Sequence, residues 1–249
     1  MSLEVSITEG SRILIVGASG GIGSALLQIL SERDDLIIGA HGASRLPPSS
    51  ANVHGIQKVL RDANDCFDLV DRFVELAGGI DHLVVALGGI SKYCDVLDVQ
   101  QTDWDHDIFV NLSAPFFLAQ RAVKSMINCE SESSIVLFGT QSASHGGGAN
   151  SLGYGVAKRG IDCLVKGLGR RLAPDHVRVN AVVPGFINSG FHERWQAMSE
   201  ESRAARVSKI PLGRAGTVSE VSFLVSYLLS EQSSFITGET FAIAGGDWL

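Results

Sequence analysis

The segment from Arg12 to Leu30 constrains the fold of this chain more than any other part of the sequence. It opens with the apolar run ILIV, which is typical of a parallel strand buried on both faces. A turn with the spacing GxxxGxG follows (Gly17, Gly20, Gly21 and Gly23), and apolar residues then recur at helical spacing. A strand, a glycine turn and a helix in this order point free backbone N–H groups and a positive helix end at a phosphate. Taken alone, the spacing is also compatible with a turn that only lets a helix pack on a strand.

The composition is that of an ordered, soluble protein. Of 249 residues, 45% are hydrophobic and 19% charged, and the net charge of −7 argues against a broad attraction to nucleic acid or anionic membranes. The four cysteines are scattered, and the seven histidines form no HExxH motif, so we expect neither disulfides nor a metal site. No signal peptide or membrane span is expected either. We therefore expect a cytoplasmic protein that acts on a small molecule.

Apolar runs and helical patterns alternate along the chain. After the first strand, further strands are predicted at residues 36–40, 53–60, 82–86, 134–138, 177–183 and 240–244. Because crossovers between parallel strands are right-handed, this alternation predicts one doubly wound Rossmann domain over residues 1–249. Its seven-stranded α/β sheet should be mostly or wholly parallel.

The helical segments carry their own signals. Asn64 or Asp65 is the expected cap of the helix before the fourth strand. A helix over 102–126 should bend at Asn111 and Pro115, because proline donates no N–H and crowds the preceding turn. A helix is predicted over 152–172, a capping box at Thr217–Glu220 precedes another, and residues 190–210 should form a substrate lid.

Tyr154 and Lys158 lie one turn apart on a predicted helix, so their side chains share a face. A free tyrosine titrates near pH 10, and a nearby ammonium favours the phenolate. Lowering the tyrosine pKa to 7–8 takes roughly 3 to 4 kcal/mol, which a close cation in a water-poor site can supply. The pair is a candidate general acid/base for interconverting a carbonyl and an alcohol. By itself the spacing also fits an interface tyrosine beside a solvated lysine.

Several motifs, in the same order, resemble the short-chain dehydrogenase/reductase family nearly from end to end of the chain. The turn VGASGGIG is similar to that family's cofactor loop, and Pro184-Gly185 after RVNAVV is similar to its Pro-Gly turn. Asn111, Tyr154 and Lys158 match three members of its catalytic tetrad. PLGRAG, FITGE and AGG resemble its C-terminal pattern, and the overall likeness is to oxoacyl-carrier-protein reductases.

The resemblance implies an NAD(P)-dependent oxidoreductase that interconverts a ketone and a secondary alcohol by hydride transfer. Tyr154 would exchange a proton with the carbonyl oxygen, and Lys158 would lower the tyrosine pKa and bond the nicotinamide ribose. The fourth tetrad position falls on Thr140, which would orient the carbonyl; Ser142 is the alternative, because the following loop leaves room for slippage. Asn111 would hold a water of the proton relay.

The resemblance also implies the cofactor contacts. Asp62, with Ala63 beside it, matches the aspartate that contacts adenine, and Ser189 stands where a hydroxyl meets the nicotinamide carboxamide. The expected cofactor-binding set is Gly17, Ser19, Gly20, Gly21, Ile22, Gly23, His41, Ser44, Arg45, Asp62, Ala63, Ala86, Gly88, Tyr154, Lys158, Pro184, Gly185, Ile187 and Ser189.

The end of the second strand bears on the choice between NAD and NADP. An acidic residue there would accept the ribose 2′-OH of NAD, but this chain has His41. Ser44 and Arg45 follow and suit a 2′-phosphate, whereas Gly20 stands where many NADP enzymes of the family carry a basic residue. A lone arginine is also compatible with a solvated loop. We expect NADP(H) in preference to NAD(H).

The chain departs from the family pattern at three places. Val16 replaces a threonine, Val85-Ala86-Leu87-Gly88 replaces an NNAG segment, and Ala244 replaces the aspartate of a DGG motif. The lost hydrogen bonds bear on loop rigidity and cofactor affinity rather than on the reaction class.

A hypothesis from another class is a non-catalytic NAD(P)-binding sensor on the same fold. The presence of Asn111, Tyr154 and Lys158 favours the enzyme, since a sensor has no need of them.

Small sugars, acyl thioesters and hydroxysteroid-like compounds are all candidate substrates. His145 and His192 are interpreted as surface histidines, with a place at the substrate pocket as the alternative. Because relatives usually assemble on the helices at 102–126 and 152–172, we expect a homotetramer or homodimer.

Overall fold

Seven parallel strands form the central sheet of this computed structural model, which describes residues 6–127, 132–148, 150–191 and 198–247. The strand order is β3-β2-β1-β4-β5-β6-β9, and every neighbouring pair is parallel. The strands are β1 Arg12–Val16, β2 Ile37–Gly42, β3 Val53–Gln57, β4 His82–Val85, β5 Ser133–Phe138, β6 Val177–Pro184 and β9 Thr240–Ile243. The prediction of a seven-stranded, doubly wound sheet is confirmed.

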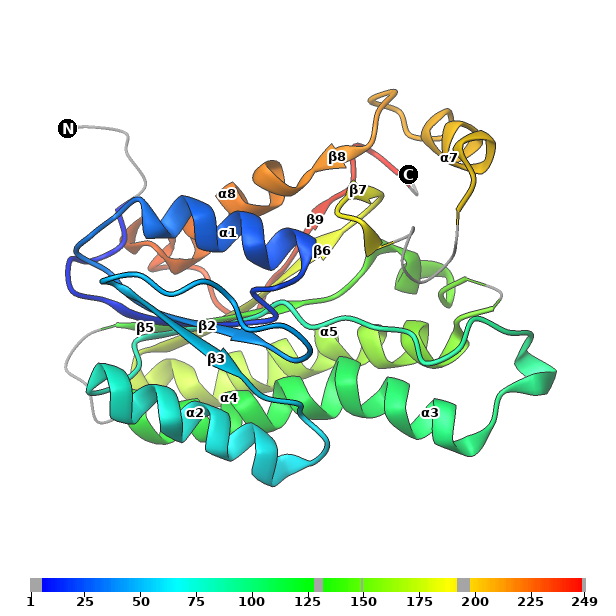
Figure 1. Cartoon of the computed structure of the whole chain (residues 1–249). Coiled ribbons are helices and arrows are strands. Elements are labelled where there is room, and N and C mark those ends of the chain that lie inside the picture. Colours follow the sequence, from blue (N-terminus) through cyan, green and yellow to red (C-terminus); the bar gives the residue numbers. More distant parts are fainter. Residues whose placement is uncertain (1–5, 128–131, 149, 192–197, 248–249) are drawn as a thin grey trace.

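Helices cover both faces of the sheet (Figure 1). α1 and α8 pack on one face, and α2, α4 and α5 on the other. The α-helices are α1 Gly21–Ser31, α2 Ala63–Ala77, α3 Gln101–Ile108, α4 Ala114–Met126, α5 Leu152–Leu172, α7 Glu200–Val207 and α8 Val218–Leu229. Short 3₁₀ helices lie at Val96–Asp98, Gln141–His145, Ala173–Asp175 and Glu231–Ser233. None of the helices in the described ranges is both long enough and apolar enough to cross a bilayer.

The apolar run of β1 shows how the sheet is buried on both sides. Ile13 and Ile15 pack into the core beneath α1 and α8, whereas Leu14 and Val16 pack into the core beneath α2, α4 and α5. Successive side chains of a strand point to opposite faces, so only a continuous apolar run suits a strand covered by helices on both sides.

Two helix boundaries correct or refine the predictions. Asp62, rather than Asn64 or Asp65, is the N-cap of α2, and its side chain accepts the backbone N–H of Asp65 at 2.9 Å. The bend expected at Asn111 and Pro115 takes the form of a π-helical segment, Phe109–Ser113, between α3 and α4. Pro115 lies in the first turn of α4, directly after this segment, and its missing N–H cannot continue the helical hydrogen bonds there.

The segment after β6 contains elements that the sequence did not predict. Ile187–Asn188 (β7) pairs with Gly216–Thr217 (β8) in a small two-stranded parallel sheet beside the main one. The expected lid contains α7, while its residues 192–197 lie outside the described part of the chain. The capping box is confirmed, because Thr217 and Glu220 bond each other's backbone N–H groups at the start of α8.

The strand order reverses between β1 and β4, whose connections leave toward opposite flanks of the sheet. At such a switch point the loops after the strands separate and leave a crevice at their carboxyl ends. The fold therefore places the turn after β1 and the loops after β4, β5 and β6 around one opening.

Gly39 of β2 tests the packing beneath α2. A Cβ at Gly39 would lie 2.4 Å from the ring of the fully buried Phe73, so Gly39→Ala should lower the free energy of unfolding by about 1 to 3 kcal/mol. Gly167 of α5 has open space around its missing Cβ, so Gly167→Ala should raise it by about 0.5 to 1 kcal/mol. Urea unfolding of both variants measures the difference, and equal effects would contradict this packing.

Candidate active site

A cavity of about 430 Å³ opens at the carboxyl ends of the central strands. The turn before α1, the loops after β4, β5 and β6, and the start of α5 all contribute to its wall. Residues expected from the sequence that line it are Gly20, Gly21, Ile22, Ala86, Gly88, Thr140, Ser142, Tyr154, Lys158, Pro184, Gly185, Ile187 and Ser189. The fold thus brings together residues that lie up to 169 positions apart between Gly20 and Ser189.

The glycine turn packs directly against the backbone of its neighbours. A Cβ at Gly21 would lie 2.1 Å from the carbonyl oxygen of Ser189, and one at Gly23 would lie 2.3 Å from that of Gly17. Gly17 itself has a φ of +92° and would place a Cβ 2.7 Å from the oxygen of Ala86. These positions require glycine because the clashing atoms belong to the backbone and cannot rotate away.

The start of α1 faces the cavity as an anion-binding end. α1 begins at Gly21 with no side-chain cap and no acidic residue in its first turn, and Gly20, Gly21 and Ile22 line the cavity. Its first N–H groups and its positive dipole end are therefore suited to a phosphate group. The residues present fit the diphosphate of a dinucleotide, since Gly20, Gly21 and Ile22 all line the cavity.

Lys158 is buried at the base of the cavity, with a relative exposure of 4%. Its Nζ donates to the carbonyl oxygens of Leu87 at 2.7 Å and Phe138 at 2.9 Å. These oxygens belong to the loop after β4 and to the last residue of β5. One side chain of α5 thus connects the ends of two neighbouring strands.

The pKa values of the two groups on this helix face depart from the sequence-based expectation. Burial raises the pKa of Tyr154 to about 12, and a hydrogen bond with the Thr140 side chain acts against that rise. Burial lowers the pKa of Lys158 to about 7. In the protein by itself burial outweighs any effect of Lys158 on the tyrosine pKa, and the Lys158 ammonium is directed at two backbone carbonyls; the lowering of the tyrosine pKa by Lys158 with a bound nicotinamide stays a prediction.

Thr140 and Ser142 were the alternatives for the serine position of the tetrad. Both line the cavity, and their hydroxyl oxygens lie 3.2 Å apart. Of the two, Thr140 is the one whose side chain affects the pKa of Tyr154, and its assignment to the serine position stays a prediction.

Asn111 lies in the π-helical segment, fully buried and outside the cavity wall. Its side-chain amide donates to the carbonyl oxygens of Gly89 at 2.8 Å and Asp107 at 2.9 Å, and its oxygen accepts the N–H of Gly89 at 3.3 Å. The side chain therefore ties the helix to the loop after β4.

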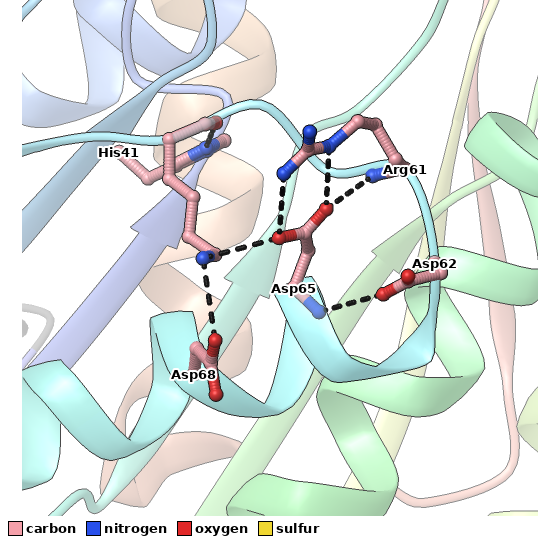
Figure 2. A network of polar contacts seen from close by, with 6 residues as sticks. His41, Arg61, Asp62, Asp65 and Asp68 are labelled. Atoms are coloured by element: carbon pink, nitrogen blue, oxygen red, sulfur yellow. Dashed lines mark hydrogen bonds and ion pairs between the residues drawn. The ribbon is translucent and has the colours of Figure 1, made fainter.

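The residues expected at the adenosine end lie outside the wall of this cavity. Asp62 is exposed and caps α2, while Arg61 and Lys58 both pair with Asp65 (Figure 2). The hydrogen bond from Arg61 holds the pKa of Asp65 well below its usual range. Ala63 begins α2 beside this network.

The residues at and after the end of β2 differ in their exposure to solvent. Ser44 and Arg45 are exposed, and the Arg45 guanidinium donates to the Ser19 carbonyl oxygen at 3.1 Å. His41 is buried with a relative exposure of 1% and is not part of the cavity wall; its expected contact with a cofactor stays a prediction. Both of its ring nitrogens bond backbone groups, at Gly17 and Lys58.

Two cavity residues, Tyr93 and Phe186, were missed by sequence reasoning. Phe191, Met198 and Arg206 line the cavity from the lid expected over residues 190–210, and His145 lines it as well, which was the alternative to a place on the surface. The Phe191 ring lies over Tyr154, with centroids 5.8 Å apart. His192 lies outside the described residues. No sequence motif marks these positions; only their proximity to the Pro-Gly turn and to the loop after β5 pointed to this region.

Comparisons with known proteins agree with this site. Residues 43–247 match the family model described as enoyl-(acyl carrier protein) reductase. The chain is 29% identical to 3-oxoacyl-[acyl-carrier-protein] reductase FabG of Escherichia coli (strain K12), with 97% of this chain and 98% of the relative covered. It is 31% identical to the FabG of Thermotoga maritima, with 96% and 98% covered.

The backbone agrees as well. A solved short-chain dehydrogenase/reductase from Brucella melitensis, titled glucose/ribitol dehydrogenase, superposes with a TM-score of 0.88 at 27% identity, covering 99% of this chain and all of that one. The chain belongs to the short-chain dehydrogenase/reductase family. As a member of that family it is an NAD(P)-dependent oxidoreductase that acts on a carbonyl or alcohol group.

The close approach of Gly21 to Ser189 leads to a test of the site. Gly21→Ala should lower the free energy of unfolding by about 1 to 3 kcal/mol and weaken dinucleotide binding, because the methyl group forces the turn away from the loop after β6. The nearest heavy atom to a Cβ at Gly20 is 3.4 Å away, so Gly20→Ala should leave stability within about 0.5 kcal/mol of wild type. Thermal unfolding compares the two, and a harmless Gly21→Ala would contradict this geometry.

Proposed function

We propose that this short-chain dehydrogenase/reductase reduces a ketone to a secondary alcohol, with Tyr154 as the proton donor. The observation that supports this most strongly is the position of Tyr154, which shares one cavity with the anion-binding start of α1 and with the buried Lys158. A reduced nicotinamide supplies a hydride to the carbonyl carbon when it is bound. The chain must then supply one proton to the carbonyl oxygen.

Tyr154 is suited to that proton transfer. Its pKa of about 12 keeps the phenol protonated at neutral pH. As the carbonyl oxygen gains negative charge it becomes a strong base and takes the phenolic proton, which gives the alcohol and a tyrosinate. The Thr140 hydroxyl, which lines the same cavity and has one hydrogen to donate, would turn from Tyr154 to the carbonyl oxygen when substrate is bound and orient the carbonyl.

Lys158 stabilises the tyrosinate that results. Its ammonium lies on the same face of α5 one turn away, and two of its three donors are fixed on backbone carbonyls. The third is left to bond a hydroxyl in the cavity, such as a cofactor ribose. Asn111 acts on the same site indirectly, by holding the loop after β4 through Gly89.

The basic loop after β2 supports NADP(H) as the cofactor. No carboxylate follows β2 to accept a ribose 2′-OH, because His41 stands there and both of its nitrogens are engaged. The exposed Arg45 guanidinium, docked on Ser19 of the glycine turn, is in reach of a 2′-phosphate on a dinucleotide in that turn. The diphosphate would lie at Gly20–Ile22, and Ser189 would meet the nicotinamide.

The apolar part of the cavity wall supports a substrate with an apolar chain. Tyr93, Phe186, Phe191 and Met198 line the same cavity as Tyr154. Relatives from Escherichia coli and Thermotoga maritima are named as 3-oxoacyl-[acyl-carrier-protein] reductases. A 3-oxoacyl thioester is therefore the first substrate to test. Assembly into a homotetramer or homodimer stays a prediction.

Replacing Tyr154 tests the proton donor. Tyr154→Phe should lower kcat for reduction of a 3-oxoacyl thioester by about 10²- to 10⁴-fold, because the hydride acceptor loses its acid. Binding of NADPH should change less than threefold. Tyr93→Phe is a matched control that removes a hydroxyl from the rim of the same cavity. The loss of the absorbance of NADPH measures turnover. Full activity of Tyr154→Phe would contradict the assignment of Tyr154 as the proton donor.

The pH dependence tests Lys158. Its lowered pKa of about 7 means that the ammonium loses its proton as the pH rises above neutrality, while Tyr154 keeps its own. The reduction rate should fall by roughly tenfold between pH 7 and pH 8.5. Lys158→Arg stays charged over this range, so its residual activity should show no such fall. A wild-type rate that stays level or rises over this interval would contradict the role of the ammonium.

A further inference from the structure

His41 is buried at the end of β2, between the glycine turn and the end of β3. In the sheet it lies opposite Val16 of β1 and Ile56 of β3. Its Nδ1 lies 3.3 Å from the N–H of Gly17, and its Nε2 lies 2.7 Å from the carbonyl oxygen of Lys58. One imidazole thus bridges the first residue of the glycine turn and the segment that follows β3.

These two contacts fix the protonation state of the ring. The Lys58 carbonyl oxygen can only accept, so Nε2 carries the hydrogen. The Gly17 N–H can only donate, so Nδ1 offers its lone pair. The native ring is therefore neutral and in the Nε2–H tautomer.

We propose that His41 is a positioning residue for dinucleotide binding, which holds the glycine turn through Gly17 and releases it when the ring is protonated. The inference rests on the proposed function, in which this turn binds the diphosphate of the cofactor. Gly17 is the residue at which the chain turns with positive φ toward the start of α1. The direction of the Gly17 N–H therefore governs where the next N–H groups point.

Protonation is incompatible with this arrangement. A hydrogen on Nδ1 would face the Gly17 N–H directly, so that the acceptor is lost and two donors confront each other. The N–H of Gly17 would then have to turn away or the imidazole would have to leave its buried position. Either change disturbs the turn before α1.

The charged groups around the ends of β2 and β3 do not favour a charged ring. Lys58 pairs with Asp65 and Asp68 on α2, Arg61 pairs with Asp65, and the Asp62 carboxylate caps α2 (Figure 2). From the loop after β2, Arg45 reaches Ser19 of the turn, and the turn itself contributes only glycine, alanine, serine and isoleucine up to Gly23.

The pKa of His41 also favours the neutral ring. Burial lowers it from 6.5, against the opposing effect of the hydrogen bond to Lys58. A histidine whose folded pKa lies below its unfolded value stabilises the native arrangement above the unfolded pKa, and that contribution is lost as the pH falls through the folded value. This contribution of His41 to dinucleotide affinity should therefore be lost as the pH falls through the folded pKa of His41, which lies below 6.5.

Two substitutions distinguish the role of Nδ1 from the role of Nε2. The side-chain oxygen of His41→Asn can take the place of Nδ1 and accept the Gly17 N–H, but it does not titrate. The amide of His41→Gln reaches the position of Nε2, where it can donate to Lys58 and leaves Gly17 without its acceptor. His54→Gln, at a histidine of β3 outside this bridge, serves as the control.

The experiment measures the Kd of NADH and NADPH by fluorescence between pH 5 and pH 8. NADH is included because it lacks the 2′-phosphate, a group that itself titrates near pH 6. Wild type and His54→Gln should bind NADH at least fivefold more weakly at pH 5 than at pH 8. His41→Asn should bind as wild type does at pH 8, within threefold, and should lose less affinity than wild type toward pH 5, whereas His41→Gln should bind weakly at every pH. A pH slope in His41→Asn equal to that of wild type would overturn the inference.

Two further results separate this inference from the proposed function. Absence of NADH and NADPH binding at every pH would overturn the proposed function and the inference with it, whereas binding with no fall at low pH overturns the inference alone. If the variants do not fold, ¹⁵N NMR of the histidine rings in the wild-type protein decides instead. The Nε2–H tautomer at pH 8 is expected for His41, and the Nδ1–H tautomer would refute the bridge.

Discussion

The buried ammonium of Lys158 is the interaction on which the geometry of the site depends. It donates to Leu87 after β4 and to Phe138 at the end of β5, so one side chain of α5 fixes the ends of two strands. A charged group in such a place is costly to bury unless its donors are satisfied. The two carbonyls satisfy most of that need without neutralising the charge. Tyr154 lies one turn earlier on α5 and lines the same cavity.

Buried polar side chains hold the loops around the cavity by hydrogen bonds to their backbone groups. Lys158 bonds Leu87, Asn111 bonds Gly89, and His41 bonds Gly17, each through a buried polar side chain that binds backbone. Backbone groups just after a strand have no ladder partner, so these side chains supply one. This explains how the chain tolerates its departures from the family pattern. The segment from Val85 to Gly88 lacks both asparagines of the family, yet bonds from Lys158 and Asn111 hold Leu87 and Gly89.

Much of the fold could be predicted from the sequence because its signals are local. The apolar run of β1 and the capping box at Thr217 depend on neighbouring residues, and both are confirmed. The predicted cap of α2 was wrong by two or three residues, since Asp62, Asn64 and Asp65 are all good caps and only the direction of the chain after β3 selects Asp62. The β7–β8 pair joins two-residue strands far apart in the sequence, which leaves no periodic signal.

The sequence predicted which residues come together at the site, but not the pKa values of these residues. Tyr154, Thr140 and the glycine turn meet because strand ends meet at one edge of a parallel sheet. The direction of the tyrosine pKa shift could not be inferred, because it depends on burial and on where the Lys158 ammonium points. His41 was interpreted as a cofactor contact because of its position after β2, and only the register with β1 and β3 reveals that its ring is buried.

The most direct test of this account is the titration of the Lys158 side chain itself, followed by NMR of the protein labelled at the lysine side chains and assigned with Lys158→Arg. The account predicts a single titration near pH 7, because the ammonium is buried among neutral carbonyls. A titration near 10.5, the ordinary value, would show that the amine is solvated and would contradict the account.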